Sequence, residues 1–135
     1  MSSRRKQRVN AIIALYQVFL LSRDIEDVFD DMEYILSEGE PKFLPFSDLE
    51  EPIKTMLIDA YEHRYIVINK INEHLSDWDF VRLGVLEQAI LFLAVSEMVY
   101  ETAERAVIIN EAVDMAKQYC DDDAFRLING VLDKL

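Results

Sequence analysis

The chain has 135 residues, with 14 basic residues against 26 acidic ones and a formal net charge of -12. A chain of this length can bury an ordinary hydrophobic core, and 51% apolar residues with one cysteine exclude disorder and a disulfide scaffold. Three glycines and three prolines are too few for the turns of an all-β domain. We therefore expect one mainly helical domain over residues 1–135, in the reducing cytoplasm.

The basic residues are concentrated at the N-terminus. Residues 1–23 hold five basic and no acidic residues, so the other 112 hold nine basic against 26 acidic ones. A basic arm can pair with phosphates, and an acidic remainder suits a basic protein partner. A solvated terminus and surface would have the same composition. A signal or transit peptide is a further alternative, but Asn10, Tyr16 and Gln17 interrupt the apolar stretch and favour a core helix.

Apolar spacing predicts about seven helices in chain order. The first should follow the basic arm and bury one stripe of side chains, namely Val9, Ile12, Ile13, Tyr16, Phe19 and Leu20. Asp24 can cap a second helix reaching about residue 37, and residues 39–46 with two prolines form a loop. The third starts either at a capping box over 47–50 or with Pro52 as its first residue, and reaches about residue 75.

The second half of the chain is more apolar. Residues 76–83, with Trp78 as a core plug, read as a short helical turn or loop before Gly84 opens a central helix to residue 100. A further helix over 105–119 precedes three aspartates, one of which can cap the last helix. We expect Asn110 and Asn129 to be buried and hydrogen-bonded internally, and Gly130 to allow close helix packing. No apolar run is long enough to cross a bilayer.

Motifs for catalysis or cofactor binding are absent from the sequence. His63 and His74, eleven residues apart on one predicted helix, would be about 16 Å apart and could not share a metal ion. The aspartate clusters lack the spacing of a calcium loop, and Cys120 has no histidine nearby in the sequence. We therefore expect no catalytic residue, no metal and no cofactor.

Several elements together resemble the NusB transcription antitermination family. They begin with the arginine-rich start that leads into Ala-Leu-Tyr-Gln at 14–17, and continue with Leu-Glu-Gln-Ala-Ile-Leu at 86–91. Ile-Asn-Glu-Ala-Val at 109–113 and Asn-Gly-Val-Leu-Asp at 129–133 follow in the family's order. The resemblance covers nearly the whole chain.

This resemblance implies an all-α bundle of two small subdomains and a non-enzymatic function. Family members bind NusE, a small-subunit ribosomal protein, and the pair recognises boxA RNA in ribosomal RNA leaders to help RNA polymerase pass terminators. By matching motif, the RNA contacts would be Arg4, Arg5 and Arg8, with Tyr16 at the edge of that surface. The partner face would contain Glu87 and Asp123. We expect RNA affinity to belong chiefly to the heterodimer.

Two other functions stay open. Leu127 stands where many members have an aromatic residue, and this departure, with the charge of -12, favours a scaffold that binds NusE but has lost RNA recognition. A similar domain also precedes an RNA methyltransferase in some proteins, although these 135 residues leave no room for a methyl-donor site. The resemblance does not decide whether the free protein forms a homodimer that hides its RNA face.

Overall fold

The computed structural model describes residues 4–38, 49–76, 79–121 and 123–135. These residues form seven α-helices and one short 3-10 helix, and no strand occurs among them. The elements are α1 (Arg4–Leu21), α2 (Ile25–Glu38), α3 (Glu51–Glu62), α4 (Arg64–Asn72), η3 (Phe80–Arg82), α5 (Val85–Tyr100), α6 (Arg105–Tyr119) and α7 (Ala124–Asp133).

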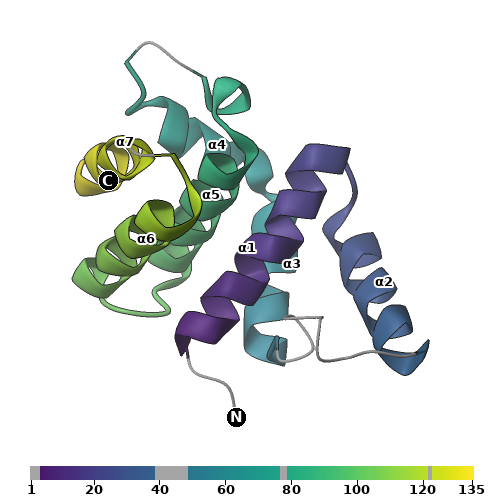
Figure 1. Ribbon diagram of the computed structural model, residues 1–135. Coiled ribbons are helices and arrows are strands. Elements are labelled where there is room, and N and C mark those ends of the chain that lie inside the picture. Colours follow the sequence, from purple (N-terminus) through teal and green to yellow (C-terminus); the bar gives the residue numbers. More distant parts are fainter. Residues whose placement is uncertain (1–3, 39–48, 77–78, 122) are drawn as a thin grey trace.

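The helices form two groups that meet along α5. Helices α1, α2 and α3 lie together on one side, and α4 to α7 lie on the other (Figure 1). Helix α1 packs extensively on α5, and α6 packs on both α5 and α7. This arrangement confirms the expected all-α fold of two small subdomains.

Helix α5 is central because it is apolar around its whole circumference. Every residue from Gln88 to Glu97 is buried, and the Phe92 ring is fully enclosed. Phe19 of α1 packs edge-on against Phe92 and Phe80, with ring centroids 5.3 and 5.4 Å apart respectively. Gly84 precedes the helix as predicted.

The stripe predicted for α1 is only partly correct, because Val9, Ile13 and Phe19 are partly buried against the core. Of the six predicted residues only Ile12 is buried, and Leu20 is 50% exposed. The buried apolar residues are Ala11, Ile12, Ala14, Leu15 and Val18. Two small alanines allow α1 to approach its neighbours closely, and apolar periodicity weighted toward large side chains missed them. Asn10 is also fully buried, and neither polar atom of its amide has a partner within the described structure.

The predicted continuous helix over 52–75 is wrong, because the chain bends at His63. His63 has φ −105° and ψ 29°, outside the α-helical range, and separates α3 from α4. The bend accompanies burial of Val67 and Ile71, which are 3% and 0% exposed. Pro52 lies in the first turn of α3, in agreement with the proline start and not with the capping box.

The predictions for the caps had mixed outcomes. The Asp24 carboxylate accepts the Glu26 backbone N–H at 2.9 Å, which confirms the cap of α2. Asp123 precedes α7, but its side chain makes no capping hydrogen bond. The last helix buries one apolar stripe that includes Ile128, Val131 and Leu132.

The roles predicted for the two asparagines and for Gly130 are wrong. Asn110 and Asn129 are exposed because the buried faces of their helices are filled by neighbouring apolar residues. A Cβ added at Gly130 would meet no atom within 4 Å, so close packing does not require this glycine. Trp78 and the loop at 39–46 lie outside the described residues. No helix in the described part of the chain is long and apolar enough to span a membrane.

Candidate nucleic-acid interface

The first turn of α1 brings Arg5 against α6. Its Nε donates to a Glu111 carboxylate oxygen at 2.8 Å, and its Nη2 donates to the same oxygen. Nη2 also lies 3.3 Å from an Asp114 oxygen. The Arg5 side chain is still 40% exposed, so solvent and a ligand can reach it. Glu111 and Asp114 are three residues apart on α6 and therefore lie on one helix face.

Arg8, one turn later, is buried. Its Nε and Nη2 donate to the two carboxylate oxygens of Glu97 at 2.9 and 3.0 Å, a bidentate pair in which both side chains are less than 10% exposed. Nη1 also donates to Glu111 at 3.3 Å. Arg8 therefore faces the interior in this structure and joins α1 to α5 and α6. This position does not favour the direct RNA contact expected from the sequence.

Arg4 is exposed and donates to the Thr102 backbone oxygen at 2.8 Å. Three arginines of α1 thus donate to acceptors in α5, in α6 and in the segment between these helices. Three carboxylates balance the charge of the arginines: Glu97, Glu111 and Asp114. The hydrogen bond from Arg5 lowers the pKa of the Glu111 carboxyl, and the same bond raises the pKa of the Arg5 guanidinium.

Tyr16 is half-buried near the middle of α1. It follows Arg5 by eleven residues, which is about three helical turns, so the two residues lie on the same side of the helix. The rise along the helix separates them by about 16 Å. Tyr16 and Arg5 thus share one side of α1 but are too far apart along the helix to be in contact.

The two expected partner residues lie at the starts of two different helices. Glu87 is in the first turn of α5, and Asp123 is the exposed residue before α7. Burial raises the pKa of the Glu87 carboxyl, and the negative charge of Asp121 adds to this rise. Burial, with the charges of Glu87 and Asp121, raises the pKa of the Cys120 thiol to about 11. Acidic groups therefore gather where α5 starts and α6 ends.

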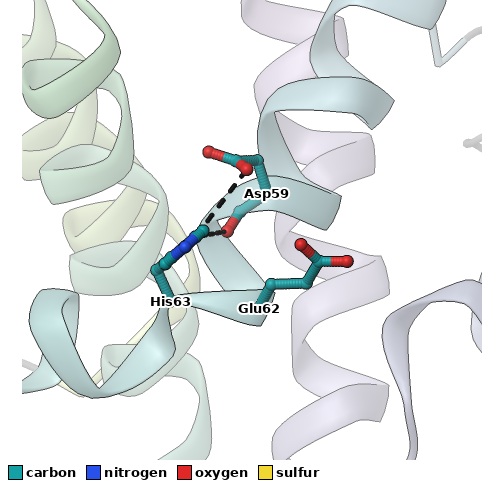
Figure 2. Close-up of side chains that lie close together, drawn as sticks. All are labelled: Asp59, Glu62 and His63. Atoms are coloured by element: carbon teal, nitrogen blue, oxygen red, sulfur yellow. Dashed lines mark hydrogen bonds and ion pairs between the residues drawn. The ribbon is translucent and has the colours of Figure 1, made fainter.

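One group of side chains in the described residues has the types needed to hold a metal ion. Asp59, Glu62 and His63 occupy the end of α3, and one ligand atom from each lies within 4.8 Å of the others (Figure 2). His63 Nδ1 lies 2.9 Å from the Asp59 backbone oxygen, and the Tyr100 hydroxyl donates to the Asp59 carboxylate. Burial, together with this hydrogen bond, raises the pKa of Tyr100 to about 12. The sequence search considered His63 only with His74 and missed this i, i+3, i+4 spacing.

Comparison with known proteins identifies the family. The profile of the NusB family matches residues 5–135. The chain belongs to the NusB family. The transcription antitermination protein NusB of Staphylococcus carnosus is 35% identical over 134 residues, which cover 98% of each chain. NusB of Wolinella succinogenes is 52% identical over 66 residues, about half of each chain (49%).

Solved structures of NusB proteins have the same fold. The NusB of T. maritima has a TM-score of 0.75 and 24% identity, covering 98% of this chain and 89% of that one. A structure of the antitermination factors NusB and NusE in complex with double-stranded RNA gives a TM-score of 0.72 with 26% identity, covering 97% of this chain and 93% of that one.

Sequence reasoning found the arginines of α1 but missed their acceptors. Glu97 lies in an apolar helix, and Glu111 belongs to a motif that was used only for the resemblance. A search for acidic residues on the buried faces of predicted helices would have selected Glu97. A buried carboxylate needs a cationic partner, and the arginine-rich first helix is the segment whose composition offers one.

Proposed function

We propose that this chain is an RNA-binding transcription antitermination subunit. With NusE it binds boxA RNA in nascent ribosomal RNA transcripts, joins the antitermination complex on RNA polymerase, and helps the polymerase read through terminators. It acts in the cytoplasm as a single non-enzymatic domain over residues 1–135. Family membership supports this proposal, together with the NusB protein of similar fold that is complexed with NusE and RNA.

The RNA surface begins at the exposed end of α1, and this feature carries the proposal. Arg4 and Arg5 are exposed or half-exposed and lie side by side in the chain, where they can contact successive phosphates. Tyr16 extends the surface and offers an aromatic ring to an unstacked base. Arg8 contributes indirectly, because its pair with Glu97 fixes the first turn of α1 against α5.

Arg5 and Arg8 at the start of α1 are already paired with carboxylates, and this explains why RNA affinity should belong chiefly to the heterodimer with NusE. RNA phosphates must compete with Glu111 and Asp114 for Arg5. The remainder of the protein is strongly acidic and repels RNA at long range. NusE, a basic protein, would mask acidic surface around Glu87 and Asp123 and add its own cations, so the pair should bind RNA more tightly than either protein alone.

The scaffold reading remains the second candidate. Leu127, where an aromatic residue is common in the family, is partly buried against the core and offers no ring for stacking. Under this reading the chain binds NusE through the same acidic face but does not increase RNA affinity.

Titration of a labelled boxA RNA separates the two functions. The RNA is titrated with this protein, with NusE, and with their mixture, and formation of the protein complex is checked by gel filtration. Antitermination predicts much tighter, sequence-selective binding by the mixture than by either protein. A formed complex with no gain in RNA affinity would instead establish the scaffold.

A further inference from the structure

A cavity of about 410 Å³ opens between α1, α3 and α5, next to the arginine arm. Its lining is mainly apolar and includes Ala11, Ile53, Met56 and Leu93. Cavities of a few hundred Å³ with apolar walls and a few polar groups are typical of sites for small ring-containing ligands. The first turn of α1, which carries the proposed RNA contacts, forms one edge of this cavity.

The polar end of the cavity is formed by the buried Arg8–Glu97 pair. Glu97 is 5% exposed, and its carboxylate accepts two hydrogen bonds from Arg8 and one from the Thr102 hydroxyl at 2.8 Å. A carboxylate offers about four acceptor positions. Among the contacts of the described residues three are used, so Glu97 retains capacity for one N–H donor from a ligand.

Arg4 lines the same cavity from its exposed side. One of its N–H groups is bonded to the Thr102 backbone oxygen, and a guanidinium has five such donors in all. A phosphate can therefore bind Arg4 while a ring attached to it enters the cavity. An apolar slot, a buried acceptor and a cation at the entrance together match one nucleotide of a single strand.

We propose that this cavity holds one unstacked base of the RNA strand that the arm binds. The base would lie between the apolar walls and donate a ring or amino N–H to Glu97, while its phosphate binds Arg4. This inference rests on the proposed RNA-binding function and adds a base-binding site to the phosphate contacts. Uracil, guanine, cytosine and adenine all carry such a donor, and an abasic sugar does not.

An abasic scan combined with a blocked cavity tests the proposal. Each nucleotide of the boxA RNA is replaced in turn by an abasic one, and affinity for the protein–NusE complex is measured. Ile53→Phe places a larger side chain at the half-buried cavity wall, and Ile66→Phe makes the same change at an exposed position on α4. Folding of both variants is checked by circular dichroism.

We expect one abasic position to reduce wild-type affinity at least about fivefold, as loss of base stacking does elsewhere. This position-specific loss should disappear in Ile53→Phe and persist in Ile66→Phe. Tight binding by the wild type without any position-specific loss, or with the same loss in folded Ile53→Phe, overturns the base site alone. Failure of the wild-type complex to bind RNA overturns the proposed function and the base site together.

A second measurement requires no substitution. RNA carrying 4-thiouridine at single positions is irradiated with the wild-type complex, and cross-linked peptides are identified by mass spectrometry. We expect one position to label the part of α3 that contains Ile53 and Met56. Labelling confined to residues that do not line the cavity overturns the base site. Reduced NusE binding by Ile53→Phe, with an unchanged RNA scan, would instead assign the cavity to a side chain of the protein partner and also overturn the proposal.

Discussion

Arg8 and Glu97 form a buried, bidentate ion pair that fastens the first helix to the central one. Both side chains are less than 10% exposed, although they are 89 residues apart in the chain. The Thr102 hydroxyl and Glu111 complete the network. An arginine that family resemblance assigns to RNA is thus a structural link between the two helix groups, and of the three arginines only Arg4 and Arg5 remain accessible.

Removing one member of this pair should destabilise the protein strongly. Arg8→Ala leaves the Glu97 carboxylate buried without its main cation, and breaking a buried pair in this way costs about 3–5 kcal/mol. Arg5→Ala, at a half-exposed position, should cost at most about 1 kcal/mol. Urea denaturation of the two variants measures both values. An equal, small loss of stability in both would show that the Arg8 pair is not structural.

Neutralising Glu111 should strengthen RNA binding. Glu111→Gln removes the carboxylate that competes with phosphate for Arg5, and we expect affinity of the NusE complex for boxA RNA to rise severalfold. Glu73→Gln removes the same charge from an exposed position at the end of α4 and serves as the matched control. Equal gains in both variants would attribute the effect to net charge and not to release of Arg5.

The same ion pair predicts a pH dependence of stability. Arg5 lowers the pKa of Glu111 below its ordinary value of 4.5, so the ionised carboxylate contributes stability above that pH. The contribution is lost as the pH falls through the lowered folded-state pKa. The difference in melting temperature between wild type and Glu111→Gln should therefore be largest near about pH 7 and shrink toward about pH 3. A difference independent of pH contradicts an ionic contribution from Glu111.

Charge reversal on the acidic face should weaken NusE binding. We expect Glu87→Lys and Asp123→Lys each to lower affinity at least about tenfold through repulsion of a basic partner. Glu87 is half-buried and Asp123 exposed, so the effect should be larger at Glu87. Asp133→Lys, an exposed change at the end of α7, is the control. Isothermal titration with NusE measures all three, and a loss at Asp133 equal to the others would remove the proposed face.

The all-helical class and the order of most helices follow from apolar spacing, because each helix must bury one face. The exact buried face of α1 does not follow, since Ala11 and Ala14 contribute to close packing although each adds little apolar area. The bend at His63 was equally hidden, because no glycine or proline marks it. The basic arm of the candidate site is visible in the sequence, whereas the exposure of Arg4 is known only from the structure.

The ion pairs between the arginines of α1 and distant glutamates could not be predicted from the sequence. Glu97 and Glu111 are more than 85 residues from the arginines that they bind, as the separations of 89 and 103 residues from Arg8 show. Only the packing of α1 on α5 and of α6 on α5 brings them together. The resemblance indicated which residues to consider, and the fold separates the exposed Arg5 from the buried Arg8.

The most direct test of the RNA-binding account is the salt dependence of boxA binding by the NusE complexes of wild type and Arg5→Ala. Affinity is measured at several salt concentrations, and the slope of its logarithm against the logarithm of salt concentration reports phosphate contacts. Loss of one contact should weaken binding and reduce the magnitude of the slope by about 1. Unchanged affinity and slope in a folded Arg5→Ala complex would contradict the claim that the start of α1 binds RNA.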